Sequence, residues 1–198
     1  MNLYNAILFS AQLCATVSSA SIRGGNIQRE LNIFDNDRII GGDEATKGRY
    51  SYSVSLQDDG GHFCGGSLIA PDVVLSAAHC AGGEYKAIIG RHDLETDDGD
   101  EVDVGIEMMH PDYDDGTTDN DFMLLFLNRS TTEDVELVQV NPDATSEGTN
   151  VTAMGWGDTN EDENIREPAN ELMEVEVTVI SNEECDNSES DEDRWEYD

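Results

Sequence analysis

The sequence predicts an all-β protein whose short strands form antiparallel barrels. Apolar and polar residues alternate with period two over residues 51–56 and again over residues 172–180, which is typical of strands with one buried face. Turn-forming residues such as those at 58–61 separate the apolar segments. Strands of this length and spacing suit an antiparallel barrel, and the sequence shows no internal repeat and no glycine pattern typical of dinucleotide-binding folds.

The first half of the chain contains most of the predicted strands, and we interpret residues 39–138 as one barrel. The continuous apolar run at 122–127 predicts a strand that is buried on both faces. Pro71 ends one of the strands. The predicted strands lie at residues 51–56, 66–70, 73–75, 85–90, 102–109 and 122–127.

The second half supplies fewer strands, so residues 139–198 predict only part of a second barrel. Residues 128–148 are polar, and the later part of this segment is expected to cross between the barrels. The strand predicted at 172–180 is followed by Ser181 and Glu184, which form a capping box for a short helix.

Composition limits the kinds of partner. The 198 residues include 44 acidic and 10 basic ones, for a formal net charge of −34. Nucleic acids and anionic membrane surfaces are therefore not expected partners, because both require a basic protein surface. The acidic residues indicate a well-solvated surface, and a preference for cationic substrates is the lesser alternative.

The N-terminus predicts export from the cell. An apolar run from Ala6 to Val17 ends at small residues before Ser21, so residues 1–20 are interpreted as a secretory signal peptide and the protein as secreted. The run is too short to span a membrane; a buried N-terminal helix is the alternative. Residues 21–38 are interpreted as a propeptide.

The cysteine count is odd in the mature chain. Cys14 would leave with the signal peptide, and Cys64, Cys80 and Cys185 would remain. In a secreted protein an odd count indicates a partner outside the sequence or a reduced thiol.

His79 is the first candidate for catalysis. It follows three small residues and precedes Cys80, so its backbone can be closely packed and anchored. An imidazole, with an ordinary pKa of about 6.5, suits proton transfer near neutral pH. A histidine beside a cysteine is, by itself, more typical of a structural residue, so the surrounding motifs decide the interpretation.

Five further motifs accompany this segment in a fixed order. In that order they resemble the trypsin-like, chymotrypsin-fold serine endopeptidases from Ile39 to about Cys185. The resemblance implies a double antiparallel β-barrel, here with the second barrel incomplete. The motifs are Arg38-Ile39-Ile40-Gly41-Gly42, His62-Phe63-Cys64-Gly65-Gly66-Ser67-Leu68-Ile69, Asp119-Asn120-Asp121-Phe122-Met123-Leu124-Leu125, Met154-Gly155-Trp156-Gly157 and Val179-Ile180-Ser181-Asn182-Glu183-Glu184-Cys185.

The resemblance implies two members of a catalytic triad. His79 matches the general base, and Asp121 matches the buried carboxylate that orients it. It further implies a protein or peptide substrate and no cofactor. Phe126 stands where the family often has lysine, which leaves the triad positions unaffected.

The third member is absent from the 198 residues. No Gly-Asp-Ser-Gly segment occurs, and neither Ser181 nor Ser188 lies in a glycine-flanked turn. We therefore expect that the C-terminal part of a protease, with its nucleophile, lies outside these 198 residues. The alternatives are a truncated, non-catalytic homologue that acts as a binding module and an acidic structural protein that kept the fold.

The resemblance also implies processing and crosslinks. An activating protease would cut the zymogen between Arg38 and Ile39. Cys64 and Cys80 would form a disulfide, while the family's partner for Cys185 would lie beyond Asp198.

Two metal sites are weaker interpretations. His62, Cys64, His79 and Cys80 do not have zinc-finger spacing, so no zinc is expected. An acidic cluster matches the loop that binds calcium in some relatives, although Arg91 stands where a ligand would be expected. We expect a solvated loop there, with calcium as the lesser alternative. The cluster comprises Asp93, Glu95, Asp97, Asp98, Asp100 and Glu101.

Asn128 and Asn150 each begin an acceptor sequence for N-glycosylation, Asn128-Arg129-Ser130 and Asn150-Val151-Thr152. Both asparagines are predicted to lie in surface turns and to be glycosylated.

Overall fold

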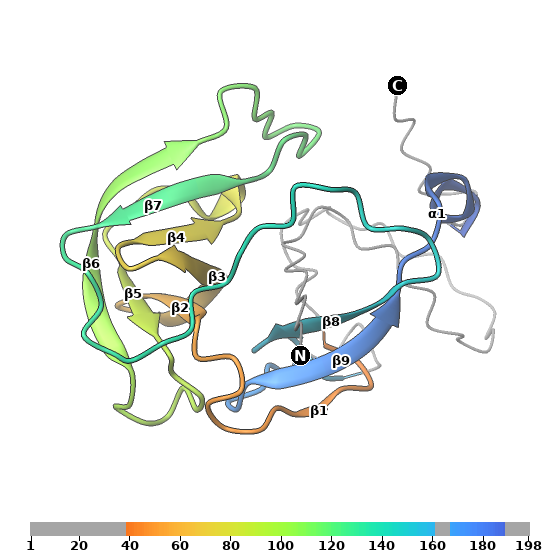
Figure 1. Ribbon diagram of the computed structural model, residues 1–198. Helices are drawn as coiled ribbons and strands as arrows, with labels where there is room; N and C mark the ends of the chain where they lie inside the picture. The colour runs from red at the N-terminus through yellow and green to blue at the C-terminus, as the bar shows by residue number, and fades with distance from the viewer. Residues whose placement is uncertain (1–38, 161–166, 189–198) are drawn as a thin grey trace, which may run out of the picture.

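The computed structural model describes residues 39–160 and 167–188, which form one closed six-stranded barrel and a separate three-stranded sheet (Figure 1). Every pair of neighbouring strands is antiparallel, and the barrel order is β2-β3-β4-β7-β6-β5. The all-β prediction is confirmed. The barrel strands are β2 (Ser53–Asp58), β3 (Gly61–Ala70), β4 (Val73–Ser76), β5 (Lys86–Ile89), β6 (Asp100–Met109) and β7 (Met123–Leu127).

The interior of the barrel is filled mainly by aliphatic side chains, to which all six strands contribute. Leu56, Leu68 and Leu125 are completely buried. In β7 the outward-facing Leu124 and Phe126 are only half-buried. The prediction that this run is buried on both faces is therefore wrong, because a barrel wall has a single interior face and the outer face of β7 stays partly open to solvent.

The second half of the chain forms β8 (Asn150–Gly155) and β9 (Met173–Thr178), which pair along their whole length. β1 (Asp43–Glu44), from the start of the described chain, joins this sheet by pairing with β9. The helix α1 (Asn182–Ser188) follows, and Ser181 caps it by accepting a hydrogen bond from the Glu184 amide at 3.1 Å. Among the described residues no helix is long and apolar enough to cross a membrane.

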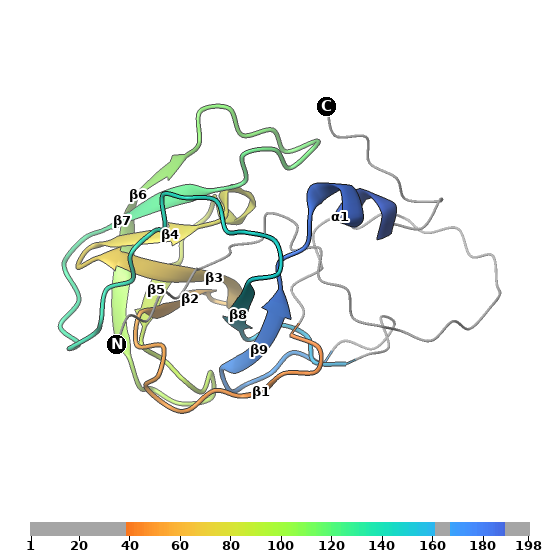
Figure 2. The ribbon, with the colours of Figure 1, turned by 45° about the vertical axis from the view of Figure 1, so that its right-hand side comes forward.

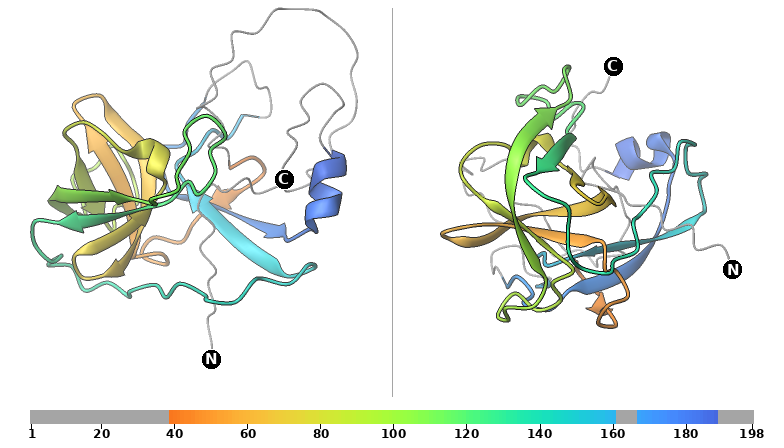
Figure 3. Two further views of the ribbon diagram at one scale, coloured as in Figure 1. Left: turned by 90° about the horizontal axis from the view of Figure 1, so that it is seen from above. Right: turned by 60° about the vertical axis from the view of Figure 1, so that its left-hand side comes forward.

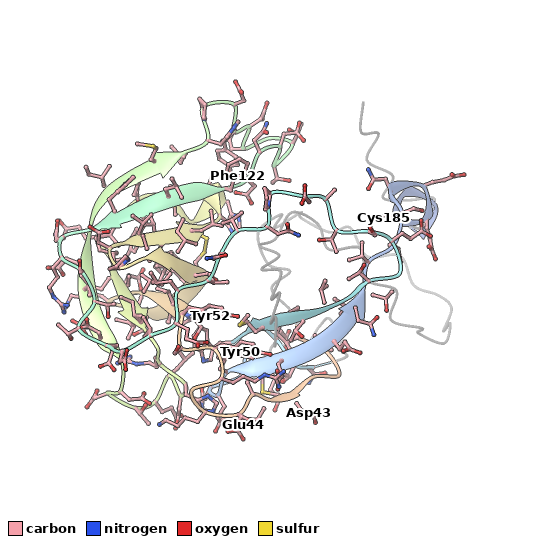
Figure 4. All side chains as sticks on the ribbon, in the orientation of Figure 1. Asp43, Glu44, Tyr50, Tyr52, Phe122 and Cys185 are labelled. Atoms are coloured by element: carbon pink, nitrogen blue, oxygen red, sulfur yellow. A yellow bond between two sulfur atoms is a disulfide. The ribbon has the colours of Figure 1, made fainter. Side chains whose placement is uncertain are left out.

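A long linker, residues 128–149, connects the two parts and runs along one side of both (Figures 2 and 3). Val138 in this linker is buried and donates its backbone amide to the Leu68 carbonyl at 3.2 Å. On the opposite edge the Tyr50 hydroxyl donates to Glu174 of β9, and Figure 4 shows Tyr50 beside that strand. The first contact holds the linker against the barrel, and the second joins the segment before β2 to the sheet.

Trp156 provides a buried contact between the two parts. Its indole Nε1 donates to the His92 carbonyl at 3.1 Å, and the Leu172 amide donates to the same carbonyl at 2.8 Å. Trp156 and Leu172 are both buried in the main hydrophobic cluster. These contacts hold the second sheet in a fixed position beside the end of the barrel.

Two adjacent glycines in β3 give a matched test of barrel packing. A methyl group added at Gly66 would lie 2.6 Å from Val74 Cγ1, whereas one added at Gly65 would meet nothing within 4 Å. We expect Gly66→Ala to lower the free energy of unfolding by about 1–3 kcal/mol, because Val74 cannot move without disturbing β4. Gly65→Ala should have little effect. Urea unfolding of both variants measures this, and equal effects would contradict the packing described.

Candidate active site

His79 lies in a single turn of 3₁₀ helix, η1 (Ala78–Cys80), directly after β4. The predicted disulfide is present: Cys80 is bonded to Cys64 of β3. Ser76 fixes the approach to this turn because its Oγ donates to the Gly65 carbonyl at 2.8 Å. The small residues and the disulfide together anchor the backbone that carries the imidazole.

Asp121 lies just before β7 and is 8% exposed. The preceding Asn120 has a φ of 55°, a left-handed conformation that asparagine tolerates better than most residues. Its Nδ2 donates to the Asp112 carbonyl at 3.0 Å, and its own carbonyl accepts from the Phe122 amide at 2.8 Å. This tight turn directs the Asp121 side chain inward. The Asn-Asp motif indicates in the sequence that Asp121 begins a buried strand, and the structure adds the left-handed turn through which Asn120 acts.

His79 and Asp121 make two hydrogen bonds with each other. The imidazole Nδ1 lies 2.6 Å from Asp121 Oδ2, and the backbone amide of His79 donates to Oδ1 at 2.8 Å. An ionised carboxylate can only accept, so Nδ1 carries the proton and, in the neutral ring, Nε2 keeps a lone pair. The His79 side chain is 23% exposed, so an outside group can reach it. This arrangement suits a general base held in one orientation by a buried carboxylate.

Tyr85 follows the turn that carries His79 and packs against Phe63 of β3. Phe63 and Tyr85 make an edge-to-face contact with ring centroids 5.2 Å apart. The Tyr85 hydroxyl donates to Glu107 at 2.5 Å, and the Gly82 amide donates to the same carboxylate at 3.0 Å. Burial, followed by this hydrogen bond, raises the pKa of Tyr85 above its ordinary value. These contacts hold the loop after Cys80 against the barrel.

His62 lies in a different environment from His79. Its Nδ1 is 2.7 Å from Ser55 Oγ, and its ring packs edge-on against Trp156 at 5.2 Å between centroids. Burial lowers the pKa of His62 to about 4. The ring therefore stays neutral at physiological pH and contributes to the contact between barrel and sheet.

The low pKa of His62 predicts a loss of stability in acid. The unfolded chain, with a histidine pKa of about 6.5, takes up a proton before the folded chain does. The contribution of His62 to the free energy of unfolding is therefore fully present above pH ~6.5. It is lost as the pH drops toward about 4, which lowers the free energy of unfolding by up to roughly 3 kcal/mol. His62→Gln should remove this part of the pH dependence. Urea unfolding at several pH values tests it, and identical pH dependence in both proteins would contradict the prediction.

Three carboxylates of the acidic cluster considered for calcium form ion pairs with three different basic residues. Within the described ranges, the only three histidine, cysteine or acidic side chains with ligand atoms mutually within 4.8 Å are Cys64, His79 and Cys80. The solvated loop stays the prediction here, with calcium binding as the lesser alternative. The acidic contacts are Asp98 with Lys47 at 2.8 Å, Glu101 with Lys86, and Asp100 with Arg129 at 2.6 Å.

The Arg129 guanidinium, together with donors from Thr131 and Thr132, lowers the pKa of Asp100 far below its ordinary value. In this way Asp100 fastens the end of β7 to the start of β6. The sequence analysis placed it only in the candidate calcium loop.

The remaining predicted site residues are scattered. Ile39 is buried, and its amide nitrogen donates to the Asp158 carbonyl at 2.9 Å. Asn128 and Asn150 are both exposed, but Asn150 begins β8, so the prediction that both lie in surface turns is wrong for Asn150. Cys185 lies in α1 and is half-buried. Arg38, the predicted signal peptide at 1–20 and the predicted propeptide at 21–38 lie outside the described residues.

Comparison with known proteins identifies the family. The family model described as Trypsin matches residues 39–196, which is most of the chain. The chain belongs to the trypsin family. It is 36% identical over 155 residues to a trypsin from Squalus acanthias, covering 76% of this chain and 66% of the relative. It is 39% identical over 127 residues to trypsin-3 of Salmo salar, covering 62% and 53%.

A solved member of the family has the same fold. Neuropsin, a serine protease expressed in the limbic system of mouse brain, superposes with a TM-score of 0.71 at 27% identity, covering 75% of this chain and 68% of that structure. The chymotrypsin-like fold is thereby confirmed. The chain spans about half to two thirds of the length of the trypsins it matches.

Proposed function

We propose that this chain is the base-bearing portion of a secreted, trypsin-like serine endopeptidase that is made as a zymogen. The observation that carries the proposal is the His79–Asp121 pair, in which a buried carboxylate holds Nδ1 and leaves Nε2 available. His79 would accept the proton of a serine nucleophile and return it to the leaving amine, while Asp121 stabilises the protonated ring.

The serine nucleophile of this protease would lie outside residues 1–198. No Gly-Asp-Ser-Gly segment occurs within them, and the matched trypsins are longer than this chain. A base and its orienting carboxylate cannot form an acyl-enzyme without a nucleophile and without amides directed at the oxyanion. We call a protein that carries both this chain and the nucleophile the complete protease. Residues 39–138 would form its first barrel, except for β1, which pairs with β9, and residues from 139 onward would belong to its second barrel.

Activation is proposed to follow cleavage between Arg38 and Ile39 by another protease. The buried position of Ile39 and its hydrogen bond to the Asp158 carbonyl support this, because a new amino terminus at Ile39 would already lie inside the protein. Residues 1–20 would direct secretion, residues 21–38 would be the propeptide, and Asn128 and Asn150 would carry glycans.

Peptidase assays of the complete protease test the proposal. The coding sequence downstream of Asp198 is read for an in-frame Gly-Asp-Ser-Gly segment, and the encoded protein is assayed on peptide amides after cleavage at Arg38. We expect hydrolysis that is abolished in His79→Ala and retained in His110→Ala. If the natural protein ends without such a segment, or if His79→Ala stays active, the chain instead fits a non-catalytic binding module.

A further inference from the structure

The Cys64–Cys80 disulfide and the His79 imidazole bring three metal-ligating atoms together beside the candidate active site. Cys64 Sγ lies 4.0 Å from His79 Nε2, and the ligand atoms of all three residues lie within 4.8 Å of one another. We propose that, once this disulfide is reduced, the three side chains bind one thiophilic divalent cation such as Zn²⁺. This binding does not depend on the proposed peptidase activity.

The donor set and its spacing suit such an ion. Zinc is held tetrahedrally by thiolate sulfur at about 2.3 Å and imidazole nitrogen at about 2.0 Å, which places neighbouring ligand atoms roughly 3.5 Å apart. The sulfur–nitrogen distance of 4.0 Å is already close to this value. The Cα atoms of Cys64 in β3 and Cys80 in η1 are 6.2 Å apart, which leaves room for side-chain rotation to separate the two reduced sulfurs.

The hydrogen bond from His79 to Asp121 prepares the imidazole for metal binding. Histidine ligands in metal sites commonly donate their other ring N–H to a carboxylate, which fixes the tautomer and the direction of the lone pair. Here Nδ1 donates to Asp121 at 2.6 Å, and Asp121 is itself buried. Nε2 lies 4.0 Å from Cys64 Sγ, so the same contact with Asp121 that would orient a base would also orient a ligand close to the sulfur.

The burial of the three ligand side chains indicates how a cation would reach them. The two cysteines are buried, whereas 23% of the His79 side chain is exposed. A cation would therefore enter from the side of the imidazole, with three protein ligands and a water molecule in the fourth position. The metal would occupy the Nε2 lone pair of His79, which the proposed function requires. The reduced, metal-bound form would therefore be unable to act as a base. This consequence alone rests on the proposed function.

A trialkylphosphine can reduce the Cys64–Cys80 disulfide in a balanced reaction. The phosphine attacks one sulfur, the sulfur–sulfur bond breaks, and water supplies the oxygen of the phosphine oxide and the two protons of the thiols. The cation then binds both sulfurs as thiolates and releases those two protons to solvent, while the neutral imidazole binds without losing a proton.

Cobalt absorption spectroscopy on the full 198-residue chain tests the proposal. Cys14→Ser and Cys185→Ser are introduced so that only the paired cysteines respond. After phosphine reduction we expect one Co²⁺ per chain, with thiolate-to-cobalt charge transfer and the strong visible bands of a tetrahedral ion. The oxidised protein should show neither, and Zn²⁺ should displace the cobalt.

Variants show which side chains bind. His79→Gln should weaken cobalt binding at least tenfold, and Asp121→Asn about 10–100-fold through loss of the second hydrogen bond. His62→Gln is the matched control and should bind as the parent does. Binding that is unaffected by His79→Gln, or weakened equally by His62→Gln, would overturn the proposed ligand set.

The folded state is followed in parallel because reduction also removes a crosslink. A metal that binds the folded protein raises the Tm of the reduced chain and preserves its near-ultraviolet circular dichroism. If the metal lowers the Tm of the reduced chain, or if the chain unfolds on reduction and the metal does not restore it, the proposal is overturned.

Discussion

Asp121→Asn is expected to reduce the kcat of the complete protease about 10⁴-fold, the size of effect that this change has in the Ser-His-Asp template of the family. The physical reason is the hydrogen bond at 2.6 Å between His79 Nδ1 and Asp121 Oδ2. A carboxylate only accepts, whereas an amide at position 121 can donate to Nδ1 and force the ring proton onto Nε2. The base would then have no lone pair facing the nucleophile.

Asp119→Asn is the matched control for this change. Asp119 is an exposed carboxylate two residues away, and its Oδ2 accepts from Thr117 Oγ1 at 2.9 Å. It makes no contact with His79 in the described structure, so its substitution should leave kcat within about twofold. Steady-state kinetics of both variants give the comparison. Equal losses would mean that the negative charge near the site matters and that the hydrogen bond to His79 does not.

Replacing both Cys64 and Cys80 with alanine is expected to lower the free energy of unfolding by about 3 kcal/mol and the Tm by roughly 10 °C. The disulfide joins residues 16 apart in sequence, and a crosslink of this length restricts the unfolded chain substantially. It also ties the turn that carries His79 to β3, so the variant should lose order at the site as well as global stability.

Cys185→Ser is the control, and it should change the free energy of unfolding by less than about 0.5 kcal/mol, because Cys185 lies in the short helix α1 away from the barrel core. Thermal and urea unfolding of oxidised proteins give both values. An unchanged Tm in the double alanine variant would show that the crosslink does not restrict the unfolded chain as assumed.

The barrel strands could be predicted because their alternation reflects one buried face. The strand expected at 85–90 is found at Lys86–Ile89, and the one expected at 122–127 is found at Met123–Leu127. β3 begins at Gly61, earlier than the expected residue 66. Antiparallel pairing with β2 holds these residues extended, although the sequence around Gly61 favours a turn. β1 is two residues long and exists only through its pairing with β9, so no local pattern could indicate it.

The candidate active site could not be predicted from local sequence patterns. His79 and Asp121 are 42 residues apart in sequence, and no periodicity indicates that they meet. Their pairing was expected only because the surrounding motifs resemble a known family. Asn120 contributes through its left-handed backbone, which depends on the hydrogen bond to the Asp112 carbonyl and therefore on the folded loop.

The tautomer of His79 tests the central claim most directly, and it can be measured on the 198-residue chain itself. Long-range ¹H–¹⁵N correlation spectra distinguish a protonated ring nitrogen from one with a lone pair. At a pH where the ring is neutral, the account predicts the proton on Nδ1, donated to Asp121, and a lone pair on Nε2. In Asp121→Asn the proton should move to Nε2. A neutral His79 protonated at Nε2 in the unsubstituted chain, or one unaffected by the substitution, would contradict the account.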